Sequence, residues 1–252
     1  MTTRQPVVVP MTNDTALNSW LLLPALALIG VLGCGGDLGL PSSSGEGVDL
    51  SILGGNGQVG TVGQELPQPL TVAVESNGAP IEGHKVAFIV AGDTAAGRLE
   101  PDTSVTGPDG RAEARWVLGP EPGSHEVVAK LVVSDPEPPP TAIFQASALA
   151  GEPDTLRALS ATSQPGRLGQ PTREAPTVLV VDRFGNPVGG TAVAWDVTAG
   201  GGSTSSAQTS TGPDGRASVT WTLGLGIGVQ KVAARVDGVH GSPVTFTATV
   251  LF

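Results

Sequence analysis

Tyrosine is absent from this sequence of 252 residues, which also holds only four tryptophans, five phenylalanines and one cysteine. A single cysteine cannot form a disulfide within the chain, so any folded domain depends on apolar burial and hydrogen bonds. Basic residues are also few: 13 lysines and arginines stand against 23 acidic residues, which gives a net charge of −10. Nucleic acid is bound through clusters of lysine and arginine, and we therefore exclude it as a partner.

Long helical periodicity is missing after residue 33. The sequence consists instead of short runs rich in valine and threonine, separated by glycine, proline, asparagine and aspartate. Glycine (36 residues) and proline (22 residues) are abundant, yet 39% of the chain is hydrophobic, which is enough to form cores. This pattern predicts an all-β protein.

One stretch of fourteen residues occurs twice in the sequence with few changes. Residues 106–119 read TGPDGRAEARWVLG and residues 211–224 read TGPDGRASVTWTLG, with ten of the fourteen positions identical. Proline presets the backbone of a type I turn and the following glycine accepts a positive φ, so the pattern predicts a three-residue hairpin loop. After each loop, apolar and polar residues alternate with the period of a half-buried strand. The predicted turn residues are Pro108, Asp109 and Gly110 in the first copy, and Pro213, Asp214 and Gly215 in the second.

The repeat extends well beyond the turn. GAPIEGHKVAFIV (residues 78–90) aligns with GNPVGGTAVAWDV (residues 185–197), and matches continue upstream and downstream. The repeating unit is therefore a whole domain of about one hundred residues, the usual size of a β-sandwich. We predict two tandem Ig-like antiparallel β-sandwiches, at residues 48–150 and 151–252.

The motifs of these copies resemble the bacterial Ig-like domains of the invasin and intimin type (group 1). The second copy carries DRFGNPVGG (residues 182–190), TGPDGRA (residues 211–217), VAA (residues 232–234) and FTA (residues 246–248), in the order and spacing of that family. The resemblance covers roughly residues 48–252. It implies stiff spacer or adhesive modules outside the cell, without implying the adhesion that invasin itself performs.

The amino-terminal segment resembles a lipoprotein signal peptide. The apolar run LLLPALALIGVLG (residues 21–33) is too short to span a membrane but suits a signal peptide, and Cys34 follows it directly. The resemblance implies a signal peptide over residues 1–33, with Met1 or Met11 as its start, and lipidation of Cys34. Residues 34–47 are rich in glycine and serine and are expected to form a flexible tether. An ordinary signal peptide or an uncleaved anchor remains the alternative.

Sequence motifs for chemistry are scarce. GNGQVG (residues 55–60) fits a dinucleotide fingerprint, but prolines follow it where a helix is required, so we read it as a loop. The three histidines are scattered without metal spacing, and no nucleophile lies beside a base in the linear order. We expect no cofactor, no metal and no enzymatic activity, although the linear order leaves spatial convergence open.

Three tryptophans allow two interpretations. Trp116, Trp195 and Trp221 lie on the apolar faces of alternating strands, which predicts core positions. An exposed set would instead indicate a carbohydrate-binding module secreted to a polymer. We favour a cell-envelope lipoprotein, at the outer membrane or cell surface, that acts as a spacer or adhesion unit toward an extracellular protein or glycan. A secreted or periplasmic location is the alternative.

Overall fold

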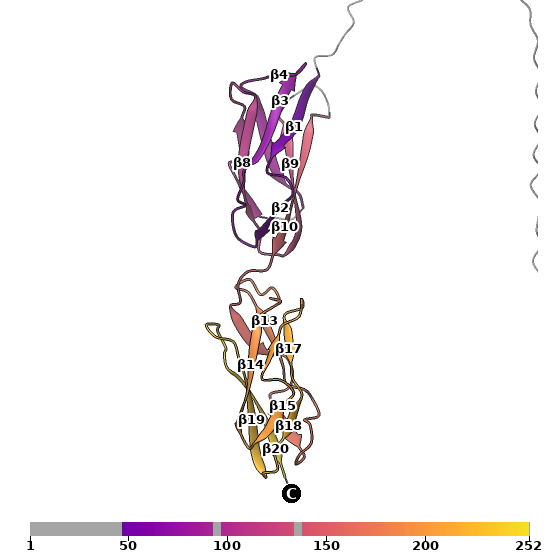
Figure 1. The fold of residues 1–252 in the computed structure, drawn as a ribbon. Helices are drawn as coiled ribbons and strands as arrows, with labels where there is room; N and C mark the ends of the chain where they lie inside the picture. Colours follow the sequence, from indigo (N-terminus) through magenta and orange to yellow (C-terminus); the bar gives the residue numbers. More distant parts are fainter. Residues whose placement is uncertain (1–46, 93–96, 134–137, 252) are drawn as a thin grey trace, which may run out of the picture. The chain divides into compact units, whose positions relative to one another are not determined.

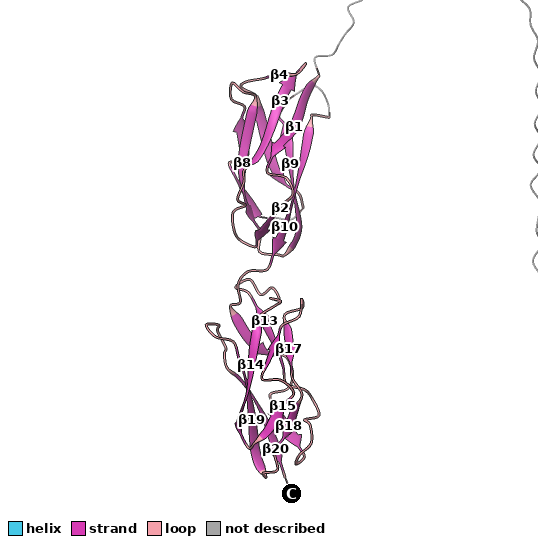
Figure 2. Cartoon of the chain, in the orientation of Figure 1, coloured by secondary structure: helices cyan, strands magenta, loops and turns pink. Residues whose placement is uncertain are grey.

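The computed structural model describes residues 47–92, 97–133 and 138–251. Within these ranges the regular elements are twenty β-strands (Figure 2), so the predicted all-β fold is confirmed. The described residues include no helix long and apolar enough to cross a membrane. The predicted signal peptide and lipidation site, Cys34, lie outside the described residues.

The first sandwich consists of two facing sheets built from residues 48–149 (Figure 1). One sheet has the order β1-β3-β8-β6, with β4 paired to β3. Its strands are β1 (Val48–Gly54), β3 (Leu70–Ser76), β4 (Ala79–Pro80), β6 (Gly97–Glu100) and β8 (Arg111–Leu118). The other sheet has the order β2-β10-β9-β5-β7. Its strands are β2 (Gln58–Thr61), β5 (Lys85–Val90), β7 (Thr103–Val105), β9 (Gly123–Leu131) and β10 (Thr141–Leu149).

The second sandwich repeats this plan with a more fragmented first layer. The five-stranded sheet β12-β20-β19-β14-β16 faces two shorter sheets, β11-β13-β17 and β15-β18. The strands of the larger sheet are β12 (Ser163–Gly166), β14 (Ala192–Ala199), β16 (Gln208–Ser210), β19 (Gly228–Arg235) and β20 (Val244–Val250). Those of the shorter sheets are β11 (Thr155–Ala158), β13 (Thr177–Val181), β15 (Gly202–Thr204), β17 (Arg216–Ser218) and β18 (Trp221–Leu223).

The named strands of each sandwich pair in antiparallel fashion except at one sheet edge. There β2 pairs in parallel with β10, and β12 pairs in parallel with β20. The last strand of each sandwich is therefore flanked at the sheet edge by the short second strand of that sandwich.

Each sandwich has a hydrophobic core of its own. Alternation of apolar and polar residues places every second side chain between the sheets, as in β8, where Ala112, Ala114, Trp116 and Leu118 are buried. A separate cluster of buried residues fills the second sandwich around Trp195, Trp221 and Phe246. The buried residues of the two sandwiches thus form two separate clusters.

The repeated turn forms locally as its residues suggest, but the strands it joins are not a hairpin. Gly110 has φ of +71° and its amide donates to the Gly107 carbonyl, as in a type I turn followed by a left-handed glycine. However, β7 pairs with β5 and β8 pairs with β3, in opposite sheets. The three-residue loop itself closes as predicted, since the Gly107 amide also donates to the Arg111 carbonyl at 3.0 Å. The hairpin does not continue into paired strands, because side-chain alternation cannot tell which strand is the hydrogen-bonded neighbour.

The same strand is continuous in one sandwich and interrupted in the other. In the first, Leu70 pairs with Ala114 at the end of the ladder between β3 and β8, and β8 continues without a break into its pairing with β6. Pro176 occupies the corresponding place in the second, where it accepts a hydrogen bond from the Val219 amide but has no amide to return one. The ladder stops there, and the strand is divided into β17 and β18.

Candidate functional site

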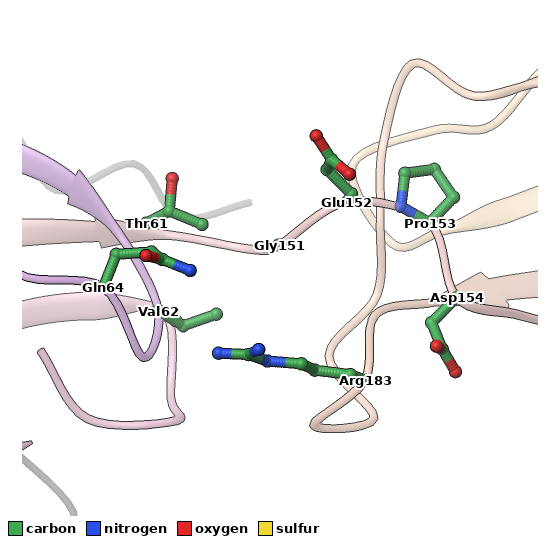
Figure 3. A pocket seen from close by; sticks show the side chains of 8 residues that line it. All are labelled: Thr61, Val62, Gln64, Gly151, Glu152, Pro153, Asp154 and Arg183. Carbon is green, nitrogen blue, oxygen red and sulfur yellow. The ribbon is translucent and has the colours of Figure 1, made fainter.

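A cleft lies where the chain passes from the first sandwich to the second. It has a volume of about 480 Å³ and is lined by both sandwiches and by the segment that joins them. Figure 3 shows the Arg183 side chain extending from the second sandwich toward Val62 and Gln64 of the first. The lining residues are Thr61, Val62, Gln64, Gly151, Glu152, Pro153, Asp154 and Arg183.

The wall of this cleft is fixed by a buried carboxylate. Asp182 follows β13 directly and is 2% exposed. Its carboxylate accepts hydrogen bonds from the backbone amides of Gly151 (2.8 Å), Phe184 (2.9 Å) and Asn186 (2.9 Å), and from Nδ2 of Asn186 (2.9 Å). These four bonds tie the joining segment, through Gly151, to the turn at residues 182–186.

The charge of Asp182 is stabilised by these bonds. Burial alone would raise the pKa of the Asp182 carboxyl, because it removes water from the ionised form. The hydrogen bonds from Gly151, Asn186 and Phe184 outweigh burial and hold the pKa of Asp182 below its ordinary value. The residue is therefore an ionised structural acceptor at neutral pH, which is unsuited to donate a proton in catalysis.

The turn held by Asp182 also contacts the first sandwich. Nδ2 of Asn186 donates to the Pro120 carbonyl at 2.7 Å. The Phe184 ring lies against Gly63, where an added Cβ would be only 2.6 Å from Cζ of the ring. The Arg183 guanidinium lies 4.6 Å above the same ring. A hydrogen bond, an aromatic contact and a cation–π contact thus meet in one turn.

The cleft offers binding surface without a catalytic constellation. Its charged groups are Arg183, Glu152 and Asp154, and its lining contains no serine, cysteine or histidine. Across the described residues, no group of three or more histidine, cysteine, aspartate or glutamate side chains could hold a metal ion.

The residues singled out from the sequence lie at separate places. Trp116, Trp195 and Trp221 are 0%, 2% and 0% exposed, each in the core of its own sandwich. Nε1 of Trp195 donates to Oγ1 of Thr209 at 2.8 Å. In the two turns, Pro108–Asp109–Gly110 and Pro213–Asp214–Gly215, the proline and aspartate are exposed and the glycine is buried. The aspartate side chains accept hydrogen bonds from the Arg111 and Arg216 amides. None of these residues lines the cleft.

Sequence reasoning missed two kinds of buried polar residue. In the sequence, Asp182 stands out only as the first residue of a family motif, and nothing around it indicates that its carboxylate is buried. The other kind is the threonine at the start of each repeated stretch of fourteen residues. Oγ1 of Thr106 donates to the Ile81 carbonyl and accepts from the His84 amide; Oγ1 of Thr211 does the same with Val188 and Thr191. Their identity in both copies was the available signal.

Comparison with known proteins gives matches among solved structures. No family model matches the chain, and no curated protein matches it. Among solved structures, the D0-D1 domain of intimin is 22% identical with a TM-score of 0.33, covering 80% of this chain and 95% of that one. The Escherichia coli adhesin FdeC is 22% identical with a TM-score of 0.48, covering 81% of this chain and 64% of that one.

An enzyme structure also matches. The β-glucuronidase of Parabacteroides merdae is 15% identical with a TM-score of 0.28, and the match covers 80% of this chain but 24% of the enzyme. The likeness to intimin is one of fold: several β-sheets that resemble tandem Ig-like domains.

Proposed function

We propose that this protein is a non-enzymatic cell-envelope lipoprotein that presents two Ig-like sandwiches as a spacer or interaction unit. The lipid would be carried by Cys34, and residues 34–47 would separate the sandwiches from the membrane. Outer membrane or cell surface is the proposed location. Its ligands would be extracellular proteins or glycans that reach the exposed strands and loops.

The bonded junction between the sandwiches is the observation that carries this proposal. A spacer must transmit position from one module to the next, which a free linker does not do. Here the joining segment is bonded through Gly151 to Asp182, and the same turn reaches the first sandwich through Asn186 and Phe184. Residues of the junction thus bond the two sandwiches to each other, and the lining of the cleft includes no serine, cysteine or histidine.

The alternative of a carbohydrate-binding module is less well supported. Such modules stack sugars on exposed aromatic rings, and the three described tryptophans are buried. Among the described residues, Phe184 is the one large aromatic with substantial exposure (41%), and Arg183 lies over its ring. No face of either sandwich therefore presents an aromatic platform within the described ranges.

The anchoring hypothesis is tested by lipid labelling. The wild-type chain and Cys34→Ser would be expressed in a Gram-negative host supplied with labelled palmitate, and intact cells would be treated with protease. We expect label on the wild type alone and cleavage in intact cells. The single cysteine makes Cys34→Ser a clean control, because no other thiol can take the acyl chain.

Each other outcome would redirect the proposal. Absence of label on both proteins would refute lipidation, and a secreted or periplasmic binding module would replace it. Label without cleavage in intact cells would keep the anchor but place the sandwiches on the periplasmic side.

A further inference from the structure

The outer face of the sheet β2-β10-β9-β5-β7 in the first sandwich carries a row of apolar side chains. Ile89 of β5 pairs with Val128 of β9, which pairs with Ile143 of β10, so the three side chains are neighbours on one face. Their chain neighbours Phe88, Val127 and Phe144 point into the core. Ile89 and Ile143 are each 50% exposed. Three adjacent β-branched side chains thus face away from the core.

Opposite charges lie on either side of this row. Glu126 and Lys130 are two residues before and after Val128 on β9, and alternation places all three on the same face. β9 is the central strand of the order β2-β10-β9-β5-β7. Within the described part of the chain, neither Glu126 nor Lys130 forms an ion pair. Along β9, the centre of the face therefore carries an acidic, an apolar and a basic side chain in that order.

The second sandwich lacks this arrangement at the corresponding positions. Asp196, Ala233 and Thr245 form the equivalent row, in the same register across β14, β19 and β20. Lys231 and Arg235 replace the acidic and basic residues that flank it. The row is polar and both flanks are basic, although the two sheets share one fold. The apolar row is thus a property of the first sandwich and not a requirement of the architecture.

We propose that this face binds the same face of a second copy of the chain. The two sheets would stack about 10 Å apart, the usual distance between packed sheets, and the two copies would be related by a twofold axis. If the axis is perpendicular to the strands and passes between the two Val128 side chains, Ile89 and Ile143 each meet their own counterparts. Glu126 of each copy then faces Lys130 of the other.

Charge selects this axis over the alternative. An axis parallel to the strands would also bring the apolar rows together, but it would place Lys130 against Lys130 and Glu126 against Glu126. Like charges opposed across sheets are destabilising, whereas the perpendicular axis gives two attractive pairs. The corresponding face of the second sandwich would oppose Lys231 and Arg235 in either arrangement, so it cannot self-associate in this way.

The association should be weak. Three apolar side chains from each copy bury less than the ~800 Å² per partner that stable interfaces typically bury. A weak contact of this kind becomes effective where many copies share one surface, because their local concentration is high. The inference does not depend on the lipid anchor, since the face is present in the folded chain itself.

The first test measures self-association of residues 47–252, which contain both cores and no cysteine. Sedimentation equilibrium over a wide concentration range should show a monomer–dimer equilibrium. Ile89→Asp gives the first sandwich the residue of the second and should weaken the dimer at least about tenfold, a change of about 1.4 kcal/mol. Leu53→Asp, on β1 of the opposite sheet, is the matched control: Leu53 is 49% exposed, and its replacement should leave the dimer unchanged.

The second test addresses the pairing of charges. Glu126→Lys and Lys130→Glu each create a face of one charge, so each variant alone should be monomeric. Mixed in equal amounts they should form a heterodimer, because the two lysines on the face of one chain would then oppose the two glutamates on the face of the other. Thermal unfolding of each variant would verify that the fold is intact.

The outcomes separate the components of the proposal. A wild-type chain that stays monomeric at every concentration would overturn it. A dimer that Ile89→Asp leaves intact would show that another surface is used. Single-charge variants that dimerise as tightly as the wild type would overturn the perpendicular axis, because only that axis pairs Glu126 with Lys130. Variants that weaken the dimer but do not recover on mixing would overturn the charge pairing.

Discussion

The two sandwiches keep the same internal bonds while their surfaces diverge. Thr106 and Thr211 bridge the same pair of backbone groups, and Gly110 and Gly215 have nearly equal φ angles of +71° and +72°. By contrast, the outer face of β9 is apolar with mixed flanking charges, and that of β19 is polar with basic flanks. Selection of the fold acts on buried positions, which must pack and hydrogen-bond in every copy. Exposed positions are free to take separate roles.

The junction shows the same divergence. Asp182 of the second sandwich is buried and accepts four hydrogen bonds, whereas Ser76, the residue at the equivalent place in the first, ends β3 and is partly exposed. Only the second sandwich follows another module through a short joining segment within the described chain. The carboxylate therefore belongs to the junction, and it is not part of the repeated core.

The largest expected effect tests whether the two cores are equivalent. Trp221→Ala should destabilise the second sandwich by about 3–5 kcal/mol, because a large buried ring leaves a cavity. Trp116→Ala should do the same to the first. Chemical denaturation followed separately in each sandwich measures both. A loss below about 1 kcal/mol for either variant would show that its ring is not part of the core.

A smaller effect should appear in how the stability of the second sandwich depends on pH, because Asp182 has no buried counterpart in the first. Asp182→Asn removes an ionised acceptor of several hydrogen bonds and should cost the second sandwich about 2–3 kcal/mol at neutral pH. The hydrogen bonds that lower the pKa of Asp182 give stability that is complete above the unfolded value of about 3.9. That stability disappears as pH falls through the lower folded pKa, so the wild type loses stability there and the variant does not.

Urea unfolding between pH 2 and pH 7 measures this difference. Asp196→Asn, at an exposed position of β14, is the matched control and should leave the pH dependence unchanged. An Asp182→Asn variant with wild-type pH dependence would contradict the assignment.

The smallest effect concerns one pair of glycines. Gly63 and Gly169 are aligned and both have positive φ (+70° and +63°), so alanine strains either backbone by about 1 kcal/mol. Only at Gly63 would the new Cβ press on the turn of the other sandwich, 2.6 Å from Phe184 and 2.8 Å from Arg183. Gly63→Ala should therefore expose the joining segment, and Gly169→Ala should not.

Limited proteolysis at residues 150–154 measures this exposure. We expect cleavage of Gly63→Ala to be about two- to fivefold faster than that of Gly169→Ala, which corresponds to roughly 0.4–1 kcal/mol. Equal rates would show that the contact between Phe184 and Gly63 does not hold the junction.

Much of the fold could be read from local patterns. Alternation with a period of two identified strands such as residues 111–118, since a strand with one buried face must alternate. The repeated stretch of fourteen residues revealed the duplication, and the order proline, aspartate, glycine predicted the turn at Gly110. What failed was strand pairing: β7 and β8 flank that turn in opposite sheets, and Pro176 divides the second copy of the strand. Pairing depends on partners far along the chain, which alternation does not identify.

The candidate site was largely hidden from the sequence. Asp182, Gly151 and Pro120 are separated by about thirty residues or more, and only folding brings them to one junction. The apolar row likewise joins Ile89, Val128 and Ile143 from three strands, and each residue alone resembles an ordinary strand position. The sequence by itself determined the all-β class and the duplication, because local periodicity and turn geometry act between near neighbours. Only the tertiary structure decided which residues meet across sheets and between sandwiches, because those contacts follow from long-range strand pairing.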